Sequence, residues 1–424
     1  MTVQISPEPT AKDGTRGTSD TTPQRTLGSR FVVPLLPSHT ALGNDNCIPS
    51  DRLTLRKRGR PSDFATCSIS GSGFSRMSRL HERYRPAGYQ RDFDGDTLWF
   101  DAIHVPGQVI LVCPRLNNLS DIVRSAQFRL DTIPVTARVR DYDRHAIITL
   151  DTDAKPTSVS VQIGQWHGES LVHEADTTGF QGCNVIVTMS KNNELRWIHD
   201  FARFHVQNHH ADGMLFIDNG SADYGPDEIL ATLKSAGIAK PVVLSTSLKF
   251  GPRGLKPFRN SELYLQTCAL NVARLRYLSR AKAVLNCDVD ELVHCTDGTI
   301  FDLARRSPLG FVTFPGSWRF PAQVRSGPVV HADHMGADPT RGPCPQKWCI
   351  VPTGPLGQFQ WRPHALERLP FSRLFRTKQA KYWHCRAITT SWKGNNRLVV
   401  PEKTIPDQEM RALLERLGTE NNHE

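Results

Sequence analysis

The chain has 424 residues, 38% of them hydrophobic and 22% charged, a composition typical of a soluble protein with room for two or three domains. No apolar run approaches the roughly 18 residues that a membrane-spanning helix needs, and the first residues lack the basic start and apolar core of a secretory signal. Lys and Arg number 52 against 42 Asp and Glu, and this net charge of +10 favours anionic ligands such as nucleotide sugars, lipid phosphates or membrane surfaces. We therefore expect a cytoplasmic protein that could also contact the inner face of a membrane.

The chain contains ten cysteines, which are scattered and form no pair separated by two residues. A chain of this length does not need disulfides for stability, so we expect reduced thiols. The spacing of Cys287, His294 and Cys295 leaves a zinc site open as an alternative.

Residues 1–85 are rich in Ser, Thr, Gly, Pro and Arg and show few sustained apolar patterns, which predicts a disordered basic leader. Within it, Arg58, Gly59 and Arg60 belong to a basic run that resembles the core of an AT-hook, an arm that fits the DNA minor groove. The alternative is a solvated basic tail that touches anionic lipid.

Residues 86–180 contain short apolar and alternating segments separated by Pro, Gly and polar turns. This texture predicts a small β-rich domain of the sandwich type. The expected strands cover 97–105, 109–112, 135–139, 146–150 and 158–163.

Residues 181–400 alternate between strand and helix patterns, and residues 401–424 are expected to form a C-terminal helix or tail. Alternation of this kind predicts an α/β domain whose mostly parallel sheet carries helices on both faces. Ligands of such sheets bind beyond the carboxyl ends of the strands. The expected strands are 184–189, 213–217, 241–244, 283–287 and 311–314, and the expected helices cover 198–205, 227–236, 261–280 and 301–306.

Two carboxylates on alternate residues, Asp288 and Asp290, follow the apolar strand 283–287. In a strand, residues two apart point to the same face, and two like charges held together are commonly explained by a hard divalent cation. Two other predicted strands also end in polar clusters, at 191–194 and 218–221. Parallel strands place these three ends on one edge, which predicts a ligand site there.

The order of these clusters resembles the inverting GT-A glycosyltransferases of the family-two and family-ninety-two type. The resemblance rests on Lys191-Asn192-Asn193-Glu194, on Asp218-Asn219-Gly220-Ser221, on Gln266 and Asn271, and on Asp288-Val289-Asp290-Glu291, and it covers roughly residues 181–400. Leu292 and Val293 depart from the family pattern, in which an aromatic residue usually follows the Glu, and the first cluster has one additional Asn. The resemblance implies a Rossmann-like GT-A fold and an inverting, metal-dependent transfer from a UDP- or GDP-sugar to a glycan or polysaccharide acceptor, as in polysaccharide biosynthesis.

The resemblance also implies roles for individual residues. Asp288, Asp290 and a late histidine, His384 first and His364 second, would hold Mn²⁺ or Mg²⁺ on the diphosphate, with Glu291 packed behind them. Trp318 would stack on an acceptor sugar, although a packed core tryptophan is the alternative. Each of the two histidines could instead be a core residue bonded to a backbone carbonyl. The nucleotide sugar would contact Lys191, Glu194, Asp218, Asn219, Asp288 and Lys347.

An inverting transfer needs a base that takes the proton of the acceptor hydroxyl. The candidates are Asp333, His334 and Glu367, with His331 in the same region, and no spacing argument chooses among them. Two other classes of protein stay open. A nucleotidyl or phosphoryl transferase could use the same carboxylate pair, and a DNA-binding protein with an inactive α/β domain could use the basic arm.

Overall fold

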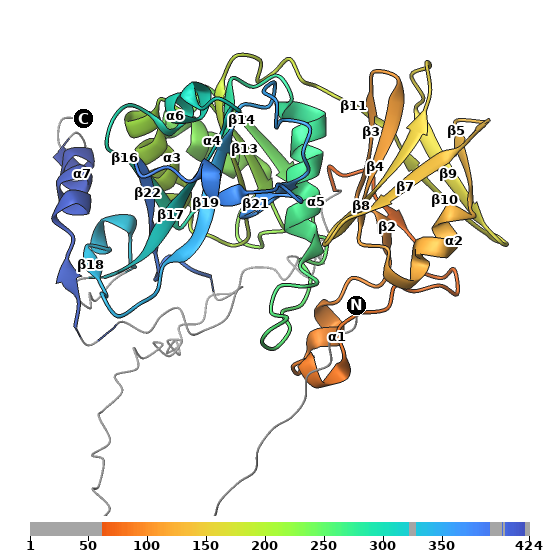
Figure 1. The fold of residues 1–424 in the computed structure, drawn as a ribbon, viewed down its shortest axis with the longest axis horizontal. Helices are drawn as coiled ribbons and strands as arrows, with labels where there is room; N and C mark the ends of the chain where they lie inside the picture. The colour runs from red at the N-terminus through yellow and green to blue at the C-terminus, as the bar shows by residue number, and fades with distance from the viewer. Residues whose placement is uncertain (1–61, 322–327, 391–400, 402, 420–424) are drawn as a thin grey trace, which may run out of the picture. The chain divides into compact units, whose positions relative to one another are not determined.

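The computed structural model describes residues 62–321, 328–390, 401 and 403–419 (Figure 1). All of them fall within one unit of the chain, Leu53–Glu424. The basic run with Arg58, Gly59 and Arg60 lies outside the described residues, so the DNA-binding alternative stays a prediction. No helix in the described part of the chain is long and apolar enough to cross a membrane.

Residues 62–85 were expected to belong to the disordered leader, and that expectation is wrong for this stretch. Strand β1 (Cys67–Ser68) pairs with β2 (Thr97–Trp99), and a 3-10 turn, η1, covers Glu82–Tyr84. The guanidinium of the buried Arg76 donates hydrogen bonds to the backbone carbonyls of Asp94 and Thr97. The alternation of Ala65, Cys67 and Ile69 with polar residues is the one strand-like pattern in this stretch and is too short to stand out; the buried apolar anchors include Phe64, Cys67, Ile69 and Leu80.

The following region is built from two sheets, with strand orders β10-β9-β5-β6 and β11-β3-β4-β8-β7 (Figure 1). All their pairings are antiparallel except that of β11 with β3. Alternate residues of both sheets enter one apolar core, among them Val109, Leu111, Val159 and Val161, as period-two strands require. The elements are β3 (Asp101–Val105), β4 (Gln108–Pro114), η2 (Asn117–Leu119), α2 (Ser120–Arg124), β5 (Gln127–Leu130), β6 (Ile133–Val135), β7 (Ala137–Asp141), β8 (His145–Asp151), β9 (Ser158–Ile163), β10 (Trp166–Leu171) and β11 (His173–Glu174), preceded by α1 (Tyr89–Asp92).

The rest of the chain is an α/β arrangement around one sheet of order β14-β13-β12-β15-β19-β17-β18-β23. Strands β12, β13, β14 and β15 are parallel, as predicted. Strand β17 runs in the same direction as these four strands but is not paired with them, because the antiparallel strand β19 lies between β15 and β17. The strands are β12 (Asn184–Ser190), β13 (Gly213–Asp218), β14 (Lys240–Ser245), β15 (Ala283–Asn286), β16 (Glu291–Cys295), β17 (Phe311–Phe320), β18 (Gly336–Ala337), β19 (Cys344–Ile350), β22 (Ala380–Cys385) and β23 (Ile405–Pro406).

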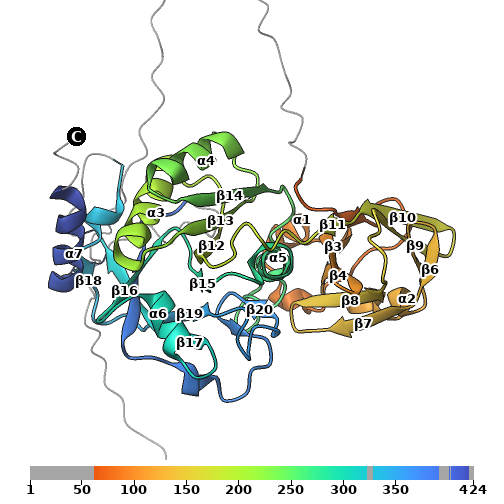
Figure 2. The same ribbon diagram turned by 90° about the horizontal axis from the view of Figure 1, so that it is seen from above.

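Helices cover both faces of the parallel strands (Figure 2). In β12, Val185 and Val187 pack in the cluster that contains α5, while Ile186 packs in the cluster that contains α3 and α4. Burial on both faces explains why these strands are apolar throughout rather than alternating. The helices are α3 (Leu195–His209), α4 (Pro226–Ser235), α5 (Tyr264–Ala273), which continues into a π-turn η3 (Arg274–Leu278), α6 (Ile300–Arg306) and α7 (Gln408–Thr419).

Strand β22 lies between β16 and β17 and pairs with both. It pairs antiparallel with β16, where His384 stands opposite Glu291, and parallel with β17, where His384 stands opposite Trp318. Residues about 90 positions apart along the chain are therefore fixed side by side by backbone register. The short elements of this region are η4 (His331–Asp333), β20 (Trp361–Arg362), β21 (Ala365–Leu366) and η5 (Ser372–Phe375).

Two buried histidines of α3 fasten the helix to β16. His209 donates from Nε2 to the carbonyl of Val293 at 2.8 Å and accepts at Nδ1 from the backbone N–H of Ile300 at 3.2 Å. His205 donates from Nδ1 to the carbonyl of Phe201 and accepts at Nε2 from the N–H of Val293. Burial lowers the pKa of His205 to about 3 and that of His209 to about 4, so both are neutral at pH 7.

This arrangement predicts that the protein loses stability in mild acid. Below about pH 6.5 the unfolded chain binds protons on these two histidines and the folded chain does not, so the free energy of unfolding falls by about 1.4 kcal/mol per histidine per pH unit. Urea unfolding between pH 7 and pH 5 measures this slope. A His205→Gln/His209→Gln double variant should be less stable at pH 7 and show a shallower slope, whereas the exposed His167→Gln should keep the wild-type slope. An unchanged slope in the double variant would contradict the assignment.

Candidate functional site

The carboxyl ends of the parallel strands meet at one edge of the sheet. Ser190 at the end of β12 stands in register with Asp218 of β13, which stands in register with Ser245 of β14. Asn286, the last residue of β15, pairs with Val187 of β12. The three predicted polar strand ends therefore do lie along one edge, which is where ligands bind in such sheets.

Asp288 and Asp290 do not extend β15 as the sequence predicted. The strand ends at Asn286, and Val289 and Asp290 form a turn that leads into β16. Asp288 and Asp290 are therefore not held on one face by strand periodicity, and their surroundings differ. His331 supports this turn from behind, because its Nε2 donates to the carbonyl of Val289 at 2.9 Å.

Asp288 and Glu291 are joined by a buried cation. The ammonium of Lys347, on β19, lies 2.9 Å from Oδ2 of Asp288 and 2.8 Å from Oε2 of Glu291. Burial alone would lower the pKa of Lys347, but the two carboxylates raise it well above its ordinary value. Lys347 was expected to contact a phosphate of the nucleotide; in the structure it is fully buried and neutralises these two carboxylates instead.

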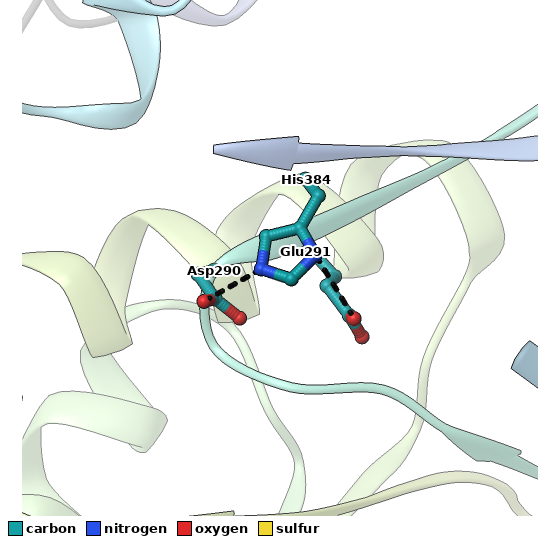
Figure 3. A group of neighbouring side chains, drawn as sticks. All are labelled: Asp290, Glu291 and His384. Carbon is teal, nitrogen blue, oxygen red and sulfur yellow. Dashed lines mark hydrogen bonds and ion pairs between the residues drawn. The ribbon is translucent and has the colours of Figure 1, made fainter. Parts of the chain in front are cut away.

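Asp290, Glu291 and His384 form a second group, drawn in Figure 3, in which the imidazole of His384 lies between the two carboxylates. Nε2 of His384 lies 2.9 Å from Oδ2 of Asp290, and Nδ1 lies 3.7 Å from Oε1 of Glu291. The three side chains are buried, and one ligand atom from each lies within 4.8 Å of the others. Burial raises the pKa of Glu291, against the opposing effect of Lys347.

Trp318 packs behind this group. Its ring centroid lies 4.3 Å from that of His384, and the guanidinium of Arg386 lies 5.1 Å from the centre of the indole. The indole therefore orients the imidazole of His384. Its expected role of stacking on an acceptor sugar stays a prediction.

Asp218 and Asn219 occupy the end of β13, and both are buried. The carboxylate of Asp218 accepts hydrogen bonds from the backbone N–H and the hydroxyl of Ser221. The amide oxygen Oδ1 of Asn219 is buried and has no hydrogen-bond partner among the residues described. A buried polar atom without a hydrogen-bond partner indicates a place where a ligand or a water molecule binds.

A cavity of about 570 Å³ lies beyond the ends of β12, β13 and β14, and Asn219 is part of its lining. Four of its lining side chains are cationic and one, Asp92, is acidic. The size is ordinary for a site that takes a small ligand, and the excess of positive charge favours an anion. The cationic residues are Arg91, Lys191, Lys249 and Arg253, and the remaining lining comes from residues 86–92 and 247–252.

The other candidates lie in separate settings. His334 is buried, with Nδ1 donating to the carbonyl of Val330 and Nε2 accepting from the N–H of Ala387 at 3.0 Å. Glu367 pairs with Arg362 and accepts from the backbone of Asp143. Asp333 caps its own turn by accepting a hydrogen bond from the backbone N–H of Val330. Glu194 is exposed at the start of α3. His364 forms a hydrogen bond with the backbone carbonyl of Gln346.

The cysteines also follow the expectation, since each of the nine in the described part of the chain is free. The zinc alternative receives no support from their positions. Cys287 contacts the carbonyl of Glu291, whereas His294 stacks on Trp383 and pairs with Glu409.

Two features of the site escaped sequence reasoning. Glu291 contributes to the group with His384, although its position beside two aspartates had suggested packing behind them. The wall formed by residues 86–92 belongs to a segment that carries no chemical motif and is distant in sequence from the sheet. Besides Lys191 and Asn219, which were predicted, the positive charge of Lys249 and Arg253 after β14 was a readable signal for the cavity.

No known family profile and no curated protein matches this chain. Among solved structures, the mannosyltransferase Ktr4p from S. cerevisiae shares 12% identity over 32% of this chain and 39% of its own, with a TM-score of 0.22. The galactosyltransferase LgtC, solved with donor and acceptor sugar analogs, shares 17% identity over 31% of this chain and 46% of its own, with a TM-score of 0.22. The bifunctional glycosyltransferase WbbM shares 14% identity over 36% of this chain and 27% of its own, also with a TM-score of 0.22.

The matched region thus spans less than half the length of each of these glycosyltransferases. Scores this low do not establish a common fold, so the function has to be inferred from the site itself.

The buried cation predicts a large effect of a single substitution. Lys347→Met leaves Asp288 and Glu291 without their counter-charge, and breaking a buried ion pair from one side costs about 3–5 kcal/mol. Urea unfolding should show this loss. A Lys347→Met/Glu291→Gln double variant should recover part of it, because one of the two uncompensated charges is then removed. A single variant as stable as the wild type would show that Lys347 does not neutralise the pair.

Proposed function

We propose that the protein is a glycosyltransferase that moves a sugar from a nucleotide-sugar donor to a hydroxyl of a glycan or polysaccharide acceptor. The observation that carries this proposal is the placement of two features on one edge of the sheet. The Asp290–Glu291–His384 group follows β15, and the cation-lined cavity follows the neighbouring strands β12, β13 and β14. A nucleotide sugar carries a diphosphate, which is the leaving group when the sugar is transferred. A cavity lined by cations could bind this anion, and a divalent cation beside the cavity could neutralise it as it leaves.

The side chains around His384 fit a metal ion. With Nε2–H donating to Asp290, Nδ1 carries a lone pair that faces the carboxylate of Glu291 at 3.7 Å, and Nδ1 has no hydrogen-bond partner among the described residues. A lone pair and a carboxylate repel each other in a buried site unless a cation or a proton lies between them. An imidazole nitrogen together with a carboxylate suits Mn²⁺ better than Mg²⁺, which prefers oxygen ligands.

In this proposal Nδ1 of His384 and the carboxylate of Glu291 would hold the metal, Asp290 would orient the imidazole through Nε2–H, and Asp288, fixed by Lys347, would border the site. When bound, the cation would neutralise the negative charge that develops on the leaving diphosphate. Of the six residues expected at the nucleotide, Lys191 and Asn219 line the cavity and are the strongest candidates for contacting it. The carboxylate of Asp218 already accepts hydrogen bonds from Ser221, and the ammonium of Lys347 is already paired with Asp288 and Glu291, so neither is a strong candidate.

The transfer itself is a displacement at the anomeric carbon. The acceptor oxygen forms the new glycosidic bond, the bond from carbon to diphosphate oxygen breaks, and the hydroxyl proton passes to a base. A single displacement inverts the configuration, as the family resemblance implies. His334 does not suit the role of base, because both of its ring nitrogens are already bonded. Glu367 is held by Arg362, and the base stays unassigned.

The metal group predicts the effect of substitutions on activity. Asp290→Asn and His384→Ala should each lower Mn²⁺-dependent hydrolysis of nucleotide sugars by about 100-fold, since several kcal/mol of charge stabilisation is lost. The assay would screen UDP- and GDP-sugars with and without a chelator. Asp223→Asn, which removes an exposed carboxylate after β13, is the matched control and should retain full activity.

Wild-type rates in Asp290→Asn and His384→Ala would refute the metal role of this group. Thermal stabilisation by a plain nucleoside triphosphate but by no nucleotide sugar would instead favour the nucleotidyl or phosphoryl transferase that uses the same carboxylates.

A further inference from the structure

An exposed loop of residues 368–378, which we call the apolar-basic loop, joins β21 to β22 and contains η5. Its Phe371 and Leu374 are 79% and 82% exposed, the largest values among the big apolar side chains of the described residues. Apolar side chains that are exposed to this degree bury little surface and so contribute little to the stability of the folded protein. Two such side chains on one turn form the kind of exposed apolar surface that marks an interaction site.

The other side of the loop is anchored to the folded protein by two contacts. The ring of Phe375 packs edge-on against Phe311 at 5.4 Å, and the N–H of Thr377 donates to the carbonyl of Thr313 at 2.8 Å. Phe375 is therefore directed into the protein, while Phe371 and Leu374 are directed out of it. The exposure of these two side chains is a consequence of the fold of the loop.

The backbone of Phe371 is in a conformation that a bulky residue rarely adopts. Its φ is 50°, in the left-handed region, where a side chain with a Cβ is crowded by the backbone. Burial of the ring does not offset this backbone strain, because the ring is exposed. Backbone strain that internal packing does not offset is concentrated at functional sites, which supports a role for this ring outside the folded chain.

The positive charge of the loop indicates that its partner is anionic. Residues 368–378 contain four cations and no acidic residue. Three of the cations, Arg373, Arg376 and Lys378, are exposed and form no ion pair with any residue that the structure describes. The fourth, Arg368, lies over the ring of Tyr142. Two protruding apolar side chains surrounded by cations match the boundary of an anionic bilayer, where acyl chains lie under a layer of negative headgroups.

We propose that the apolar-basic loop binds the surface of anionic lipid bilayers, with Phe371 and Leu374 inserted at the headgroup level and Arg373, Arg376 and Lys378 paired with lipid phosphates. The binding would be peripheral and reversible, since one apolar pair and three cations do not suffice for permanent insertion. This inference does not depend on the proposed activity, because no residue of the loop belongs to the metal group or lines the cavity.

Co-sedimentation of the full chain with vesicles tests the proposal. The protein should bind vesicles of phosphatidylcholine mixed with phosphatidylglycerol and should not bind vesicles of phosphatidylcholine alone, with binding weakened by salt. Phe371→Ser/Leu374→Ser should weaken binding by about tenfold or more, and Arg373→Gln/Arg376→Gln/Lys378→Gln by a similar factor with a smaller salt dependence. Ile133→Ser/Leu171→Ser removes two apolar side chains that are 61% and 67% exposed elsewhere, and should leave binding unchanged.

The basic leader could bind the same vesicles, so a further full-length variant, Arg56→Gln/Lys57→Gln/Arg58→Gln/Arg60→Gln, separates the two. The proposal holds if binding survives in this variant and is lost in the loop variants, whose unfolding midpoints should match that of the wild type. It is overturned if the loop variants bind as the wild type does. It is also overturned if vesicles are never bound and Phe371→Ser/Leu374→Ser instead dissolves a dimer seen by ultracentrifugation, which would make the loop a contact between copies of the chain.

Discussion

The ion pair that the site depends on is the one between the ammonium of Lys347 and the carboxylates of Asp288 and Glu291. Several carboxylates in a short turn would repel one another, and burying them unpaired would cost several kcal/mol each. Lys347 removes this cost from inside the protein, because β19 lies between β15 and β17 and carries the ammonium beneath the turn. The negative charge that stays beside His384 is then available to a cation from outside.

The position of His384 between Asp290 and Glu291 follows from the return of the chain through β22. Its register with β16 and β17 places His384 opposite Glu291 and beside Trp318, while His331 holds the turn at Val289. Backbone pairing, rather than loop flexibility, thus fixes the imidazole between two carboxylates. A site built on strands in this way is preorganised, which favours tight metal binding and selective placement of a diphosphate.

The sequence was sufficient to predict the parallel strands and the edge where their ends meet, because strands buried on both faces have a clear apolar signature. It also identified Asp290 and His384, which the structure brings together. It could not show that Lys347 is consumed by Asp288 and Glu291, or that residues 62–85 are ordered, since both depend on contacts between segments that are distant in the chain. The insertion of the antiparallel strand β19 between β15 and β17 was missed for the same reason, because its place in the sheet is set by pairing with strands that are distant in the chain.

The central claim is that a divalent cation and a nucleoside diphosphate bind together at this edge of the sheet. Calorimetric titration of UDP and GDP into the wild-type protein, with Mn²⁺ or with a chelator, measures this coupling directly. The account predicts that at least one of the two nucleotides binds much more tightly with Mn²⁺, and that the coupling is lost in Asp290→Asn. Equal affinity of both nucleotides with and without the metal would contradict it.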